Sequence, residues 1–111
     1  KSNAEGYKKV RSNIILFDDL KFLDDDEIKT ILSELNMELL SVALCSIEDE
    51  TYQAIDRNLI KTSKAMVEQY LRLKGATVSK KEIEVAQASI LEVVSKLESE
   101  GKVNLKDKIK L

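Results

Sequence analysis

The stretch SKKEIEVAQASILEVVSKLESEG, residues 79–101, decides the fold. Its apolar residues recur every three or four positions, which is the spacing of one face of an α-helix. These residues are Ile83, Ala86, Ile90, Val93, Val94 and Leu97. Ser79 and Glu82 have the spacing of a capping box, which satisfies two backbone N–H groups at a helix start. Gly101 suits the left-handed conformation that ends many helices, so we predict a long helix from about Lys80 to Gly101.

A second helical pattern runs from Leu59 to Lys74. Apolar residues recur along one side of this segment and predict its buried face. These residues are Met66, Val67, Tyr70, Leu71 and Leu73. Gly75 follows directly and is predicted to stop the helix, because glycine is common just beyond helix ends. Similar patterns predict three shorter helices, over residues 25–35, 38–45 and 48–58.

Composition supports an all-helical fold of one domain. Proline is absent and only three glycines occur among 111 residues, so few residues interrupt helices. Asp24 and Glu27 repeat the capping-box spacing at the start of the helix predicted over 25–35. A chain of this length can bury one modest core. We therefore predict an all-α fold, a compact bundle of about five to six helices.

Charge and residue types exclude several classes of function. The net charge is -2 and the pI is near 5.3, which gives no general attraction to nucleic acid. The single cysteine, Cys45, allows no internal disulfide, and the absence of histidine removes the commonest general base. No apolar run approaches the roughly 20 residues that span a bilayer. We expect a cytoplasmic protein-interaction domain with no cofactor, no direct membrane insertion and no enzymatic activity.

The two ends of the chain carry less of the helical pattern. The first residue is Lys1 rather than methionine, so we expect a piece of a longer protein, with residues 2–4 resembling an expression tag. Val103 and Leu105 lie among lysines, and the segment that holds them is expected to be extended or frayed. We assign an upstream helix end or linker to residues 1–13, a helical domain to 14–101 and a tail to 102–111.

An apolar run, Ile14, Ile15, Leu16 and Phe17, precedes the first helical pattern. Such a run is compatible with a β-strand as well as with a helix end. No second convincing strand is present to pair with it, and an isolated strand would leave its backbone groups unpaired. We interpret the run as a helix end or connector.

The densest acidic cluster lies around the start of the helix predicted over 25–35. It consists of Asp18, Asp19, Asp24, Asp25, Asp26 and Glu27. Paired carboxylates can act as acid and base or hold a divalent cation, so a metal-dependent enzyme is one interpretation. The spacing lacks the glycine and the distal glutamate of a calcium loop, and acidic residues also stabilise helix N-termini. We favour the helix N-terminus and predict no metal site.

Cys45 also has two interpretations. A nucleophilic thiolate needs a nearby base or cation, and the chain has no histidine to supply one. Cys45 stands at the end of an apolar stripe. We therefore favour a small buried or half-buried thiol.

The helix predicted over 59–74 carries a charged stripe, which consists of Lys61, Lys64, Glu68 and Arg72. Spacings of three and four place these side chains on one helical face. Such a stripe can be an ordinary solvated face. It can also be a docking surface that steers an acidic partner and releases it quickly, because exposed ion pairs are weak. We predict that the charged stripe binds protein and that no residue is catalytic.

Four segments, in order, resemble the C-terminal domain of the flagellar motor switch protein FliG. They read NIILFDDLKFLDDDEI, LSELNMELLSVAL, RNLIKTSKAM and EVAQASILEVVSKLESEGKV. In that family an apolar hinge reading Met-Phe-Val-Phe precedes an acidic pair and a Leu-Asp-Asp helix start. Residues 14–17, 18–19 and 23–25 occupy those places. Val85, Ala86 and Gln87 match the Glu-Ala-Gln of the family's last helix.

The resemblance implies an armadillo-like helical domain of the bacterial flagellar rotor, cytoplasmic and peripheral to the inner membrane at the basal body. It implies contact with the stator, torque generation, and switching of rotation in motility and chemotaxis. The implied partners are a MotA-like stator protein, a FliM-like switch protein and other FliG copies. The membrane-ring protein FliF is reached only through an N-terminal region missing from this sequence. Residues 14–17 are implied to form the hinge that moves the charged helix.

Several charges of the family are replaced in this chain. The family has lysine at Cys45, arginine at Thr62 and an acidic pair at Gln69 and Tyr70. In one interpretation the charged stripe substitutes for them and the domain is a working rotor element. In another the chain is a diverged paralogue that serves as a scaffold without generating torque. A generic helical adaptor unrelated to motility is the third.

Overall fold

The computed structural model describes residues 15–105 and 108. These residues form five α-helices and two 3-10 helices and contain no strand. In chain order the elements are η1 (Phe17–Phe22), α2 (Asp25–Leu32), α3 (Met37–Ala43), α4 (Asp49–Asp56), α5 (Lys61–Lys74), η2 (Gly75–Thr77) and α6 (Lys80–Ser99). The predicted all-α fold is confirmed.

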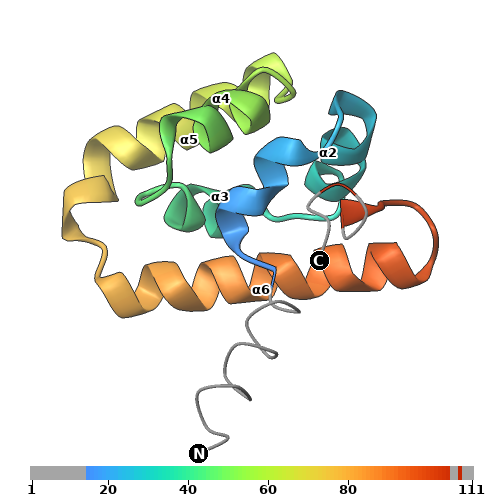
Figure 1. Ribbon diagram of the computed structural model, residues 1–111. Helices are drawn as coiled ribbons and strands as arrows, with labels where there is room; N and C mark the ends of the chain where they lie inside the picture. Colours follow the sequence, from blue (N-terminus) through green and yellow to red (C-terminus); the bar gives the residue numbers. More distant parts are fainter. Residues whose placement is uncertain (1–14, 106–107, 109–111) are drawn as a thin grey trace, which may run out of the picture.

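The helices pack around α3. Figure 1 shows α6 along one side of the molecule and α4 and α5 along the opposite side, with α3 between them. Helix α3 packs against both α5 and α6, while η1 packs against α4 and α6. Helix α2 closes the end near α4 and α6. The short connections between these helices leave neighbouring elements in direct contact.

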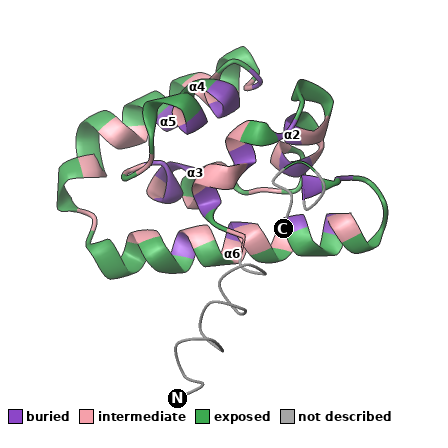
Figure 2. Cartoon of the chain, viewed as in Figure 1, coloured by how far each residue is buried: buried purple, intermediate pink, exposed green. Residues whose placement is uncertain are grey.

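One apolar core joins all five α-helices, η1 and the segment after α6. Figure 2 shows the buried residues on the inward faces of these elements. Helix α6 contributes Ala86, Ile90, Val94 and Leu97, whereas α5 contributes only Val67. The remaining buried apolar residues are Phe17, Leu20, Leu23, Ile28, Ile31, Leu40, Ala43, Leu44, Ala54, Ile55, Val103 and Leu105.

Side-chain caps begin the helices that the sequence marked most clearly. The Glu82 N–H donates to Ser79 Oγ at 3.1 Å, and the Ser79 N–H donates to Glu82 Oε1 at 2.9 Å. Asp24 and Glu27 form the same reciprocal pair at the start of α2. Both predicted capping boxes are confirmed. Asn36 caps α3 by accepting from two backbone N–H groups, and α2 ends at Leu32, before the predicted residue 35.

The two glycines that follow long helices behave differently. Gly101 has φ 78°, the left-handed conformation that was predicted. Gly75 has φ -55° and ψ -37°, and the chain continues through it into η2. Helix α5 therefore ends beside Gly75 as predicted, but a tighter helical turn ends it rather than a left-handed glycine.

The segment after Gly101 corrects our expectation of an extended or frayed tail. Val103 and Leu105 are buried and belong to the core. The Asn104 N–H donates to Glu27 Oε2 at 2.8 Å, and Lys108 Nζ donates to Glu27 Oε1 at 2.6 Å. Two apolar side chains and a shared carboxylate therefore hold this segment against α2. Whether residues 102–111 form a separate unit stays a prediction.

The apolar run at the start is partly described. Ile14 and residues 1–13 lie outside the described residues. Ile15 packs against the core, Leu16 is exposed, and the buried Phe17 begins η1. Residues 15–17 therefore connect into a 3-10 helix, as the interpretation of a connector predicted. Among the described residues, no helix is both long enough and apolar enough to cross a bilayer.

Candidate protein-binding surface on helix α5

Helix α5 lies at the edge of the bundle and exposes most of its surface. Val67 is its single buried residue, and Leu71 and Tyr70 are half-buried beside it. A helix has about 3.6 residues per turn, so a single buried position among the 14 residues of α5 leaves a wide face in contact with solvent. This face is available for another protein.

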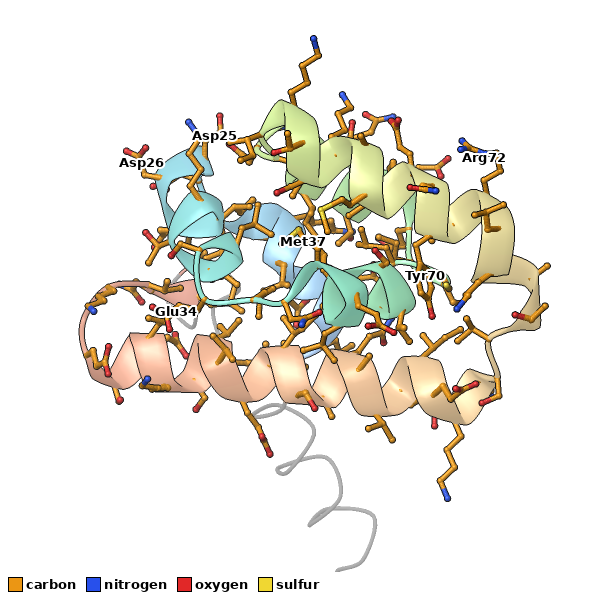
Figure 3. The ribbon with its side chains drawn as sticks, turned by 180° about the vertical axis from the view of Figure 1, so that it is seen from behind. Asp25, Asp26, Glu34, Met37, Tyr70 and Arg72 are labelled. Atoms are coloured by element: carbon orange, nitrogen blue, oxygen red, sulfur yellow. The ribbon has the colours of Figure 1, made fainter. Side chains whose placement is uncertain are left out.

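The charged stripe lies on that face, with one exception. Lys61, Glu68 and Arg72 are exposed, and Lys64 is half-buried. Figure 3 shows Arg72 projecting away from the body of the molecule, while Tyr70 lies between α5 and α3. The structure therefore brings the four predicted residues onto one side of α5. Whether they bind protein stays a prediction.

Lys64 is engaged within the domain. Its Nζ lies 3.1 Å from Asp56 Oδ2 of α4. The hydrogen bond to Asp56 raises the pKa of Lys64, and the charge of Asp56 adds to the effect. Lys64 and Glu68, like Glu68 and Arg72, are four residues apart, a spacing that allows ion pairs on a helix. Neither pair is an ion pair among the described residues. Three of the four charges therefore remain for a partner.

Asp56 and Tyr52 form the inner border of this surface. Asp56 Oδ1 is buried and has no hydrogen-bond partner among the described residues. Burial raises the pKa of Tyr52, and the negative charges of Asp56 and Glu68 raise it further. Lys64 therefore compensates a carboxylate that is partly removed from water, which explains why it turns inward rather than toward Glu68.

An exposed apolar row, Met66 and Leu73, lies on the other side of the buried Val67 from the charged stripe and was missed in the sequence. Met66 is 56% exposed and Leu73 is 66% exposed, although both were predicted on the buried face of this helix. Positions seven apart lie above one another on a helix, and this pair is rotated about 100° from Val67. The spacing of Met66 and Leu73 indicates a second apolar face, because α5 buries a narrower stripe than its apolar residues suggest.

Residues 15–17, part of the predicted hinge, lead into η1, which is bonded to α4. The Glu48 N–H donates to Asp18 Oδ1 at 3.1 Å, and Thr51 Oγ1 donates to the Asp18 carbonyl oxygen at 3.3 Å. These bonds tie η1, which begins at Phe17, to the start of α4. The Lys64–Asp56 ion pair then joins the end of α4 to α5. A set of contacts therefore runs from Asp18 of η1 through α4 to Lys64 of the charged stripe.

The acidic cluster is used for helix starts and tertiary contacts. Asp25 Oδ1 accepts hydrogen bonds from Asn58 Nδ2 and Arg57 Nε, both at 3.0 Å. The bond from Asn58, followed by the bond from Arg57, lowers the pKa of Asp25. Asp24 and Glu27 cap α2. The described part of the chain holds no group of three or more metal-ligating side chains that could bind an ion.

Cys45 is a half-buried thiol just beyond α3, as the second interpretation of this residue predicted. Its Sγ donates to the Ser41 carbonyl oxygen at 3.4 Å. Burial raises the pKa of the Cys45 thiol. The thiol is therefore less easily ionised than a free cysteine, which is the opposite of what a nucleophile requires.

Comparisons with known proteins agree on one family. Residues 1–105 match the model described as the FliG C-terminal domain. The chain is 31% identical over 101 residues to the flagellar motor switch protein FliG of Thermotoga maritima, covering 91% of this chain and 30% of that protein. It is 27% identical over 96 residues to FliG of Borreliella burgdorferi, covering 86% and 28%. The chain therefore spans less than a third of the length of these relatives.

A solved structure shares the fold. The crystal structure of FliG residues 86–343 from H. pylori superposes with a TM-score of 0.84 at 22% sequence identity, covering 92% of this chain and 48% of that one. This likeness supports the helical arrangement described above.

Proposed function

The chain belongs to the family of FliG C-terminal domains, and from this premise we propose that it is a rotor element of the flagellar motor switch that contacts the stator through α5. One observation carries the proposal. Helix α5 buries a single side chain and exposes three of the four charges of the stripe to solvent. A surface of weak, exposed charges suits a contact that forms and breaks repeatedly.

The sign of the exposed charge specifies the partner. Lys61, Arg72 and Lys74 are exposed cations of α5, whereas Glu68 is the exposed carboxylate among them. A partner surface with an excess of carboxylates would therefore be attracted and oriented. We infer that the stator segment that meets α5 is acidic.

The contacts between η1, α4 and α5 support a role for residues 14–17 as the hinge. Switching requires an element with two arrangements that is coupled to the contact surface. Asp18 is bonded to the start of α4, and Asp56 at the end of α4 is bonded to Lys64. A change at the hinge would therefore alter the position or the pairing of Lys64. We propose this set of contacts as the coupling.

The remaining expectations belong to the same proposal. We propose a location at the inner face of the membrane in the basal body, with a MotA-like stator protein, a FliM-like switch protein and other FliG copies as partners. We also propose that the domain acts by binding and not by catalysis. FliF would be contacted by other parts of the rotor protein.

The test is charge reversal at the two exposed cations of the stripe. In the motile cell, Lys61→Glu with Arg72→Glu in the full-length protein should reduce swimming speed strongly while protein level and flagellar number stay normal. Lys64 is left unchanged, because a carboxylate there would face Asp56. The matched control reverses two exposed cations of α6, Lys80 and Lys96. Normal motility in the α5 variant would count against the proposal, as would equal loss in the control.

A second function is favoured by the exposed apolar row. Met66 and Leu73 are more typical of a lasting contact than of a repeated one. We therefore propose, as the second function, that the chain is a diverged paralogue that serves as a scaffold of the basal body and generates no torque. A deletion strain separates the two functions. Complete flagella that do not turn would support the rotor element, whereas incomplete or misplaced flagella would support the scaffold.

A further inference from the structure

A groove of about 510 Å³ lies at the start of α5, apart from the face that carries Arg72. It is formed by the end of α2, the start of α3 and the turn between α4 and α5. Its apolar lining consists of Leu32, Met37, Leu59 and Ile60. Lys29, Ser33, Asn58 and Ser63 complete it. Figure 3 shows Met37 between α3 and α5, inside the molecule's outline rather than projecting from it.

Ile60 is unfavourable for the isolated domain in two ways. It is 69% exposed, more than any other large apolar residue that the structure describes. It also occupies the N-cap position of α5, where its side chain accepts no hydrogen bond. Serine, threonine, aspartate or asparagine is preferred there because the first N–H groups of a helix need an acceptor. The α6 start has such a residue, Ser79.

Lys29 is the one charged side chain among the described residues that line the groove, and Lys61 follows Ile60 at its edge. Neither Lys29 nor Lys61 forms an ion pair with another described residue. The acidic side chains Asp25 of α2 and Asp56 of α4 are already bonded to other cations. The uncapped start of α5 adds the positive end of the helix dipole. A ligand with carboxylates beside its apolar side chains therefore complements this site.

We propose that this groove docks a short apolar segment of a partner protein, flanked by carboxylates, with Ile60 as the central contact. The segment would place its apolar side chains against Leu32, Met37 and Ile60 and a carboxylate near Lys29 and the start of α5. An exposed apolar residue in a concave, partly polar setting is the usual form of such a contact. The inference does not depend on whether the stator is the partner of the charged stripe.

The test uses the 111-residue chain and two synthetic helical peptides. Both carry leucines along one face, at the spacing that fits a groove. One has glutamates at both ends and the other has lysines. We expect the glutamate peptide to shift the amide resonances of residues 29–37 and 58–63 and to bind at least about tenfold more tightly than the lysine peptide.

Substitution of Ile60 distinguishes docking from a structural role. Ile60→Ser supplies a cap, so it should raise the thermal midpoint while weakening the glutamate peptide about tenfold. Val85→Ser is the matched control, because Val85 is also exposed, at 56%, but lines a different groove between α3 and α6. The control should change the affinity by less than about twofold. Lys29→Glu should weaken the glutamate peptide as well, without altering the start of α5.

Four outcomes would overturn the proposal. Equal binding of the two peptides would remove the charge argument, and resonance shifts around Val85 would place the site elsewhere. Unchanged affinity in both Ile60→Ser and Lys29→Glu would remove the groove. Self-association of the chain in sedimentation, lost in Ile60→Ser, would show that a second copy covers Ile60. None of these outcomes depends on motility, so they leave the proposed rotor function to its own test.

Discussion

Helices α5 and α6 are both long and amphipathic, yet they are used in different ways. Helix α6 has 20 residues, begins with a capping box and buries four apolar side chains. Helix α5 has 14 residues, begins at an uncapped Ile60 and buries only Val67. The first is built for stability. Helix α5 buries fewer side chains and has no side-chain cap, so more of its apolar and charged side chains are exposed to solvent.

The largest expected difference lies in the apolar residues of the two helices. Leu97 of α6 is 1% exposed, and Leu73 of α5 is 66% exposed. Leu97→Ala should lower the free energy of unfolding by about 2–5 kcal/mol because it leaves a cavity. Leu73→Ala should change it by less than about 0.5 kcal/mol. Urea unfolding followed by circular dichroism measures both, and similar losses would mean that α5 contributes to the core after all.

A smaller effect is expected where the segment after α6 meets α2. Glu27 accepts from the Asn104 N–H at 2.8 Å and from the Asp24 N–H at 3.1 Å. Glu27→Ala should lower the free energy of unfolding by about 1–3 kcal/mol, because two backbone N–H groups lose a charged acceptor. Glu34→Ala, at an exposed position just after α2, is the control. An Asn104 amide that exchanges equally fast in both variants would contradict this role of Glu27.

The helix starts give the next contrast. Ser79→Ala removes the cap of α6 and should lower the free energy of unfolding by about 0.5–2 kcal/mol. Ile60→Ser adds a cap to α5 and should raise it by about 0.5–1 kcal/mol. Thermal unfolding of the two variants and of the parent chain measures both changes in stability, the expected loss and the expected gain. Destabilisation by Ile60→Ser would mean that the isoleucine packs more firmly than its exposure indicates.

The smallest expected effect concerns pH. Hydrogen bonds from Asn58 and Arg57 lower the pKa of Asp25 below its usual 3.8. A carboxylate whose pKa is lower in the folded state stabilises that state above its unfolded pKa. This contribution is lost as the pH falls through the folded pKa. Asp25→Asn should therefore flatten the decline in stability below about pH 4, as measured by urea midpoints from about pH 7 to pH 3. If the decline in stability were unchanged in Asp25→Asn, the loss at low pH would be assigned to Asp24 and Glu82, whose pKa values are lowered by backbone hydrogen bonds.

Local signals in the sequence predicted most of the helices. Ser79 with Glu82 and Asp24 with Glu27 form the expected capping boxes, because these contacts involve residues only three apart. Gly101 adopts the expected left-handed conformation. The resemblance to the FliG C-terminal domain, now shown by the match over residues 1–105, supplied the arrangement that local signals cannot give. The contacts that could be predicted from the sequence were therefore those between residues within one helical turn.

Features that depend on distant partners were not predicted. Lys64 pairs with Asp56 rather than with Glu68, because a partly buried carboxylate of α4 needs a compensating cation, which no local spacing reveals. Met66 and Leu73 are exposed because the width of the buried face depends on how closely α3 approaches α5. Val103 and Leu105 are buried in the core, and Glu27 of α2 accepts a hydrogen bond from the backbone N–H between them. Helical periodicity predicted which side chains share one face of a helix. It did not predict which faces pack against another element.

The return of the chain after Gly101 determines where the protein can be shortened. A fragment ending with the last turn of α6, at Ser99, would look complete by secondary structure, yet it would lack Val103 and Leu105 and expose the apolar surface that they cover. It would also leave Glu27 without the Asn104 N–H. The shortest fragment with a fully covered core therefore extends at least through Leu105. A fusion partner is better joined beyond Lys108 than at the end of α6.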